Sequence, residues 1–180
     1  SNPVAVTVTE EPLPWEGNGS EESPYLIKSV SDLEALREKV NKDGFTFSDA
    51  YFRLDADITL PDGWKPIGAT KNGKVNLENG ANLNAFSGIL DGAGHTITVP
   101  EGGLPLFGYV RNTRIRNLNI YGKKIAGYGL INNFEGVGLS GSAVEIDNVT
   151  LKSGSSTLKS GLLGANKTVN GYAGCSAAFV

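Results

Sequence analysis

The sequence predicts an all-β solenoid that begins with a short helix, and three observations lead to this fold class. From Tyr51 onward, short apolar segments alternate with turn residues in a chain of 180 residues that contains 24 glycines. The pattern Ile-x-Asn-apolar-x-apolar occurs at residues 115–120 and again 31 residues later, at 146–151. A second type of apolar segment alternates with the first, so two strand types recur about every 20 to 30 residues, as in a solenoid.

The region before these repeats is predicted to be a cap. Residues 1–14 contain three prolines and read as an extended lead-in. Residues 15–50 form the expected N-terminal cap, with one helix over about residues 32–40. Ser31 and Glu34 have capping-box spacing at its start. Helical periodicity follows at Val30, Leu33, Leu36 and Val40.

Residues 51–180 are expected to form the coils, where one coil is a full turn of the solenoid. Glycine or asparagine separates nearly all of the predicted strands, which are 51–60, 84–90, 95–99, 104–110, 115–122, 127–134, 144–153, 160–166 and 176–180. The looser copy at 95–99 places Ile97 in the row of Leu118, 21 residues later. The second strand type comprises Phe86–Ile89, Leu106–Val110, Leu130–Phe134 and Leu162–Ala165.

Asn117 and Asn148 are predicted to form structural corners. Leu118 and Ile120 share one face of a strand, whereas Ile115 has the opposite parity, so a corner must fall between them. Asparagine tolerates the left-handed conformation that a one-residue corner needs. Because stacked strands lie about 4.8 Å apart, the two amides are expected to hydrogen-bond along the stack.

Several motifs occur in the order seen in the capped N-terminal region of large bacterial surface proteins. The motifs are Trp15–Ser20, Ser23–Ile27, Phe52–Ile58, Trp64–Gly68 and Phe86–Ile97. Leu106-Phe107-Gly108 and Gly161–Gly164 are similar to the GLUG repeats of the same proteins, which also occur beside metallopeptidases that cleave immunoglobulin A. Residues 15–180 therefore resemble this group.

The resemblance implies a right-handed parallel β-helix of the pectin-lyase type, exported and displayed on a bacterial surface. It does not imply an enzyme, because such regions are mostly modules whose activity lies elsewhere. The zinc motif of those peptidases, His-Glu-x-x-His, is absent from this sequence.

Composition narrows the chemistry. The single Cys175 excludes an internal disulfide framework and a thiolate metal site, and the single His95 excludes a multi-histidine site, so we expect no metal and no cofactor. No apolar run approaches the roughly 20 residues that cross a bilayer, so membrane insertion is not expected. The chain has no Met and begins Ser1-Asn2-Pro3, which suggests an excised or processed piece.

Three carboxylates and the histidine are the candidates for acid–base chemistry. Asp55 and Asp57 share parity and, with Asp91, could form an acidic cluster on one sheet. The alternative is that these carboxylates accept backbone N–H groups at turns, and this is the interpretation we favour. His95 lacks an evident partner in the sequence and is expected to be structural or at the surface. We therefore predict no catalytic residue.

Other distinctive residues are expected to be structural. Cys175 lies in an apolar stretch and is expected to face the core, although a reactive thiol is the sharper alternative. Trp15 and Trp64 could stack on sugar rings, but burial at the open end of the core is favoured.

A basic segment is the candidate ligand-binding surface. It contains no acidic residue and comprises Arg111, Arg114, Arg116, Lys123 and Lys124. Nucleic acid is not expected, because the net charge is −3. Among ligands, an acidic polysaccharide or an acidic protein surface is the better candidate, but a solvated face without a ligand is the interpretation we favour.

The sequence thus predicts a non-catalytic structural or adhesive module that is secreted or at the cell surface of a bacterium. Its candidate partners are a polysaccharide or a host surface protein. Further coils or another chain are expected at the C-terminal edge, because Ser176–Val180 ends within a strand pattern. The alternatives are a polysaccharide lyase or glycoside hydrolase, and a carbohydrate-binding module.

Overall fold

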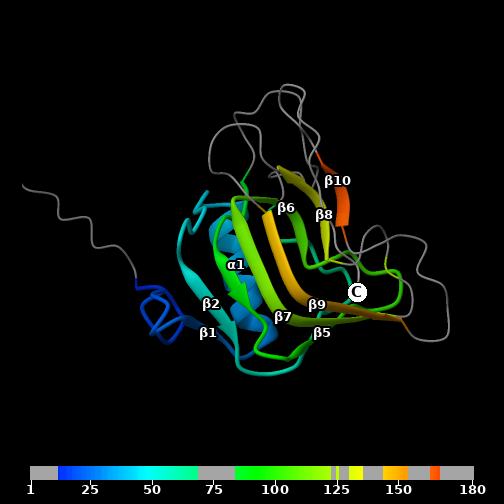
Figure 1. Ribbon diagram of the computed structural model, residues 1–180, viewed down its shortest axis with the longest axis horizontal. Coiled ribbons are helices and arrows are strands. Elements are labelled where there is room, and N and C mark those ends of the chain that lie inside the picture. The colour runs from blue at the N-terminus through cyan, green and yellow to red at the C-terminus, as the bar shows by residue number, and fades with distance from the viewer. Residues whose placement is uncertain are drawn as a thin grey trace, which may run out of the picture.

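A computed structural model describes residues 12–68, 84–122, 125, 130–135, 144–153 and 163–166. This part contains one helix and ten strands, and all strand pairings in it are parallel, so the all-β prediction is confirmed (Figure 1). The elements are β1 (Tyr25–Ile27), α1 (Val30–Asn41), β2 (Tyr51–Leu54), β3 (Ile58–Thr59), β4 (Ile89–Asp91), β5 (Thr96–Thr98), β6 (Phe107–Arg111), β7 (Thr113–Gly122), β8 (Ile131–Glu135), β9 (Val144–Ser153) and β10 (Leu163–Asn166).

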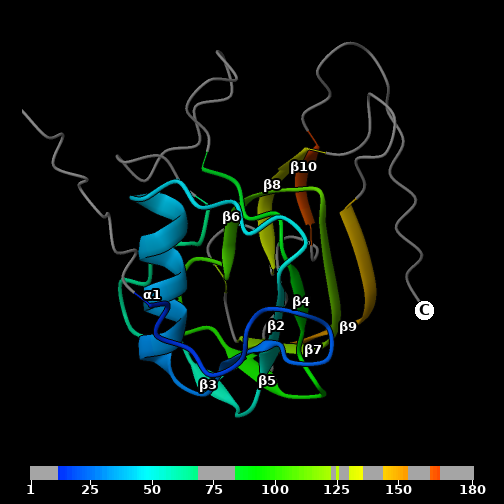
Figure 2. The same ribbon diagram turned by 90° about the vertical axis from the view of Figure 1, so that its left-hand side faces the viewer.

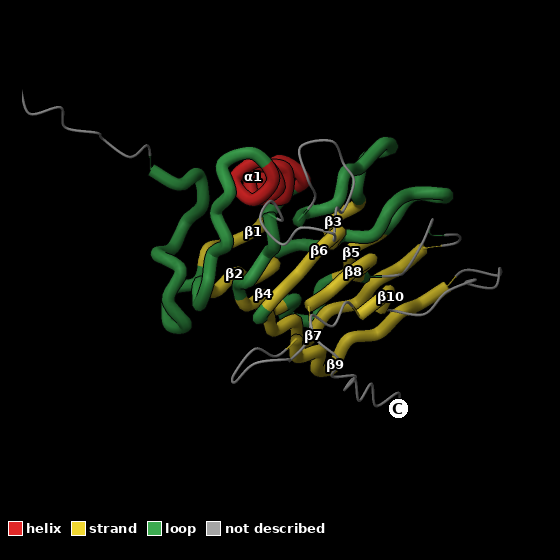
Figure 3. Tube along the Cα trace, turned by 90° about the horizontal axis from the view of Figure 1, so that it is seen from above, coloured by secondary structure: helices red, strands yellow, loops and turns green. Residues whose placement is uncertain are grey.

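The strands form two parallel sheets, and Figure 3 shows these strands in yellow with α1 in red beside them. In the larger sheet, β1, β2 and β4 pair in order up to the first half of β7, and β3 and β5 pair up to its second half. The strand β9 then pairs with β7 along its whole length. The smaller sheet has the order β10-β8-β6. From β5 and β6 onward, the two strand types predicted from the sequence therefore occupy different sheets.

Asn117 bends β7 in the middle. Ile115 and Leu118 are both buried although their parity differs, because Asn117 has a φ of 52°. Asn148 does the same in β9 with a φ of 49°, and its neighbours Asp147 and Val149 pair with Arg116 and Leu118. Both residue pairs thus keep register through the bend.

The earlier copy of this repeat differs from the expectation. Ile97 pairs with Ile120 and not with Leu118, because the turn 92–95 lengthens this bend.

The first member of the second strand type, Phe86–Ile89, also differs from the prediction. Phe86 bridges to Val110 and Ile67 bridges to Phe107, whereas Ile89 already belongs to β4 in the larger sheet. The predicted strand 84–90 is therefore divided between the two sheets.

Aromatic rings fill the core between the sheets. Phe52, Phe86 and Phe107 are at most 1% exposed, and their rings follow one another with centroid distances of 5.8 Å and 5.1 Å. Aliphatic rows continue the core along the larger sheet: Leu90 pairs with Ile115. Contacts of this kind between large buried side chains supply most of the driving force for folding.

The helix α1 lies at one end of the strand stack, and β9 lies at the other (Figure 2). The helix α1 buries Leu33, Leu36 and Val40 against the core, as the periodicity predicts. The helix begins earlier than predicted: Ser29 is the N-cap, and its hydroxyl accepts a 3.3 Å hydrogen bond from the N–H of Asp32. The predicted Ser31–Glu34 capping box is therefore wrong, because Ser31 already lies within the helix.

Both tryptophans are buried beside this helix. Trp15 is 6% exposed, and its indole N–H donates to the carbonyl of Asp32 at 3.2 Å. Trp64 is 2% exposed, donates to the carbonyl of Pro105 at 3.2 Å and lies under the guanidinium of Arg37. Both side chains are packed within the protein and present no open stacking surface.

Candidate functional site

The outer face of the larger sheet carries a row of charges of alternating sign. Alternate strand residues point outward, and the register places Arg53 beside Asp91, Asp91 beside Arg116, and Arg116 beside Asp147. These residues come from β2, β4, β7 and β9 in turn. Carboxylates of the neighbouring strands therefore lie beside Arg114 and Arg116 of the basic segment.

Two arginines of the predicted basic surface are held in ion pairs. Arg116 Nε donates to Asp91 Oδ2 at 2.8 Å, and Arg114 Nε donates to Glu145 Oε2 at 2.5 Å. The hydrogen bond to Glu145 raises the pKa of Arg114. Burial opposes ionisation of Asp91, but hydrogen bonds from Ala93 N–H, the Asn117 amide and Arg116 prevail and lower its pKa.

Of the other three residues of the predicted basic surface, the structure describes only Arg111. Arg111 is half-buried at the end of β6, and its backbone N–H donates to the carbonyl of Phe86 at 3.0 Å. Lys123 and Lys124 lie outside the described residues, as do Cys175 and the segment 176–180. Binding of an acidic ligand by this segment stays a prediction.

A file of side-chain hydrogen bonds runs along the bends of the larger sheet. The Asn148 amide donates to Asn117 Oδ1 at 2.9 Å, and the Asn117 amide donates to Asp91 Oδ1 at 3.2 Å. Asp91 Oδ1 also accepts from Ala93 N–H at 2.8 Å. The file thus joins β9 to β7 and β7 to the turn after β4.

Asp57 and His95 meet at the turns beside β3 and β5. Asp57 Oδ1 accepts from the Thr96 N–H at 2.8 Å and lies 3.1 Å from His95 Nδ1. These hydrogen bonds, the first from the backbone and the second from His95, lower the pKa of Asp57. The sequence interpretation missed this pair, although aligning Ile58 with Ile97 would have brought Asp57 next to Thr96.

Asp55 and Asp57 do not form the outward-facing strand pair considered from their parity. The strand β2 ends at Leu54 and β3 begins at Ile58, so both residues lie in the connecting turn. Asp55 is 3.9 Å from Arg53, whereas Asp57 faces the next turn of chain. Within the described residues, no group of three or more His, Cys, Asp or Glu side chains is placed to hold a metal ion.

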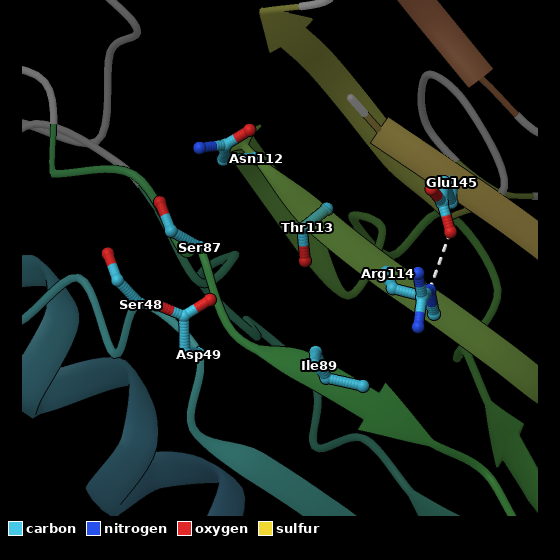
Figure 4. A pocket seen from close by; sticks show the side chains of 8 residues that line it. All are labelled: Ser48, Asp49, Ser87, Ile89, Asn112, Thr113, Arg114 and Glu145. Carbon is cyan, nitrogen blue, oxygen red and sulfur yellow. Dashed lines mark hydrogen bonds and ion pairs between the residues drawn. The ribbon is translucent and has the colours of Figure 1, made fainter. Parts of the chain in front are cut away.

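A shallow polar hollow of about 240 Å³ opens at the junction of several elements (Figure 4). Its lining comprises Ser48, Asp49, Ser87, Ile89, Asn112, Thr113, Arg114 and Glu145. Asp49 and Asn112 have φ values of 63° and 54°, which shape the backbone around it. Thr113 Oγ1 donates to the carbonyl of Gly88 at 2.5 Å and fixes the buried wall.

The lining offers complementary hydrogen-bonding groups. Hydroxyls from Ser48 and Ser87 can donate or accept, the carboxylate of Asp49 accepts, and the guanidinium of Arg114 donates toward Glu145. Sequence reasoning had identified only Arg114 among these residues. The others come from segments that lie far apart along the chain, such as 48–49 and 145, so no local motif marked them.

None of the helices among the described residues combines the length and apolar character needed to span a membrane. No family model matches the chain, and no solved structure matches it.

Two curated proteins are similar to it. One is Halomucin of Haloquadratum walsbyi, which is 32% identical over 175 residues, covering 92% of this chain and 2% of Halomucin. The other is described as a Gly-rich membrane protein of Evansella cellulosilytica and is 31% identical over 123 residues, covering 61% of this chain and 12% of that protein. The chain therefore corresponds to a small part of each of these relatives.

Proposed function

We propose that this chain is a non-catalytic structural or adhesive module that acts at the cell surface or outside the cell, and that its strands form a right-handed parallel β-helix. The parallel registers of both sheets support the β-helix, because a connection between parallel strands of one sheet is right-handed in about 98% of cases. The similarity to a protein described as a membrane protein supports the location. The resemblance to surface proteins with GLUG-type repeats supports the same role.

The observation that carries this proposal is the use of polar side chains as braces between strands. Asp57 binds the backbone of Thr96, the Arg116 guanidinium binds Asp91, and Asn148 binds Asn117. Polar side chains that could have acted as acids, bases or ligands thereby join one strand to the next. A stack braced in this way suits a stiff element that positions other surfaces.

An activity screen tests the non-catalytic role. The purified chain is incubated with polyuronates and with neutral polysaccharides, and the release of unsaturated or reducing ends is measured. We expect no turnover. Turnover that is lost in Asp57→Ala but kept in Asp62→Ala, an exposed carboxylate in the turn before Trp64, would establish an enzyme of the lyase or hydrolase class instead.

A second candidate function is carbohydrate binding in the polar hollow. The specific observation is its lining of hydroxyl, carboxylate, amide and guanidinium groups, which together can pair with the vicinal hydroxyls of a sugar. The sugar would bind weakly, because the hollow is shallow and none of its described lining residues is aromatic.

Titration of the chain with neutral and acidic oligosaccharides, followed by NMR or calorimetry, tests this site. We expect Asp49→Asn and Glu145→Gln to weaken binding and Asp62→Asn to leave it unchanged. Binding that all three variants retain would place the sugar elsewhere.

A further inference from the structure

The strand β9 presents a patterned edge at the end of the larger sheet. Within the described part of the chain it pairs with β7 on one side, and it lies at the far end of the stack from α1 (Figure 2). An unpaired strand edge exposes N–H and C=O groups that can accept a further strand. What this edge would accept depends on its side chains.

The charges on β9 favour a basic strand. The row that crosses the sheet reads Arg53, Asp91, Arg116 and Asp147, so the sign alternates at every strand. In the neighbouring row, Glu145 follows Arg114. Because opposite charges on adjacent strands stabilise a pair and like charges destabilise it, the next strand should carry cations beside Glu145 and Asp147.

The asparagine file adds a directional requirement. Asp91 Oδ1 accepts the Asn117 amide N–H, which turns Asn117 Oδ1 toward β9, where it accepts from Asn148. A carboxylate only accepts hydrogen bonds, so Asp91 fixes the orientation of both amides. The file therefore ends on Asn148 Oδ1, an acceptor, and the next member must be a donor.

We propose that the outer edge of β9 binds a parallel β-strand of a partner polypeptide with the pattern cation–aliphatic–cation–Asn–aliphatic. The cations face Glu145 and Asp147, the asparagine donates to Asn148, and the aliphatic residues extend the rows of Ile146 and Val149. The strand β7 of this chain already has this pattern at Arg114–Leu118 and pairs with the other edge of β9.

A second copy of the chain fits the edge less well. Two β9 edges would bring acidic residues together, which is unfavourable. The opposite end of the sheet, β1, has Leu26 in the row that continues to Arg53, so it offers no cation to Asp147. Charge complementarity therefore selects a separate basic strand.

A peptide-binding experiment on the full chain tests the proposal. A labelled peptide with the sequence of residues 113–122 is titrated at low salt and compared with the same peptide carrying Arg114→Glu and Arg116→Glu. We expect the basic peptide to bind at least about tenfold more tightly, since two cross-strand charge reversals are involved. Hydrogen exchange should show protection of β9. Failure of the basic peptide to bind, or protection of another segment without β9, would overturn the proposal.

A charge swap tests the register. Asp147→Lys in the protein should weaken binding of the basic peptide by about threefold or more and improve binding of a peptide carrying only Arg116→Glu. The matched control is Asp62→Lys, which makes the same change in net charge at an exposed turn outside β9. If Asp62→Lys has the same effect as Asp147→Lys, the attraction is a general charge effect and the proposed register is wrong.

Discussion

Asp57 Oδ1 accepts a 2.8 Å hydrogen bond from the backbone N–H of Thr96, 39 residues later in the chain. A side chain in the turn after β2 thus binds the first backbone N–H of β5, a strand that follows much later. The bond links two turns that the sequence separates widely, and its strength depends on the charge of one exposed carboxylate.

This dependence predicts acid sensitivity. The pKa values of Asp57 and Asp91 are lowered in the folded protein, so their stabilising effect is complete above the unfolded pKa of about 3.9 and is lost as pH falls through the folded values. We expect the urea midpoint of unfolding to fall steeply below about pH 4. Asp91→Asn should flatten this part of the profile, whereas the matched change Asp62→Asn should not. An unchanged slope in Asp91→Asn would contradict the assignment.

The bend at Asn117 predicts that Asn117→Ala lowers the free energy of unfolding more than Asn117→Gly does. Asn117→Ala removes the amide bonds to Asp91 and Asn148 and should lower the free energy of unfolding by about 1–3 kcal/mol. It also leaves alanine at a φ of 52°, for a further cost of about 1–2 kcal/mol. Asn117→Gly should lose only the hydrogen-bond contribution, because glycine adopts this φ without strain. If denaturant unfolding finds the glycine variant as stable as the wild type, the amide file adds nothing to stability.

Two glycines with nearly equal φ values allow backbone strain and crowding to be separated. Gly63 and Gly68 have φ values of 76° and 78°, but a Cβ at Gly68 would overlap the carbonyl of Tyr109, whereas one at Gly63 meets no atom within 4 Å. Gly63→Ala should cost about 1–2 kcal/mol, and Gly68→Ala should cost more than about 3 kcal/mol. Thermal unfolding measures both. Equal losses would show that β6 can move away from Gly68.

The observed helix cap predicts different effects for two nearby serines. Ser29→Ala removes the acceptor for the Asp32 N–H and should lower stability by about 1 kcal/mol. Ser31 is exposed within α1, so Ser31→Ala should change stability by no more than about 0.5 kcal/mol. Chemical denaturation distinguishes the two starts of the helix, and the reverse ranking would favour the cap predicted from the sequence.

The repeats were predictable where the bends have equal length. The residues from Arg116 to Ile120 and from Asp147 to Leu151 are spaced identically, so a simple displacement aligned them. The copy at β5 was misaligned because the turn 92–95 adds residues before Thr96. Periodicity within one strand does not report the length of the turn before it, and that length sets the register.

The sequence predicted the basic residues of the charged surface but not their acidic partners. The basic residues lie close together in the sequence, whereas their acidic partners Asp91 and Glu145 come from β4 and β9. The polar hollow was missed for the same reason, since its lining combines segments that meet only after folding. A local sequence pattern shows which residues belong to one strand. Which residues of other strands pair with their charges is decided by how the strands stack.

The variable turn between the two halves of the larger sheet also has a practical consequence. Between Asp91 and Ile97 lie five residues, whereas three lie between Arg116 and Ile120, yet the strands on both sides stay paired. Ala93 and Gly94 at its tip are exposed. Foreign sequence grafted between them would be carried on a turn whose flanking strands are both paired with β7, which makes this turn a natural position for displaying an epitope or a labelling tag.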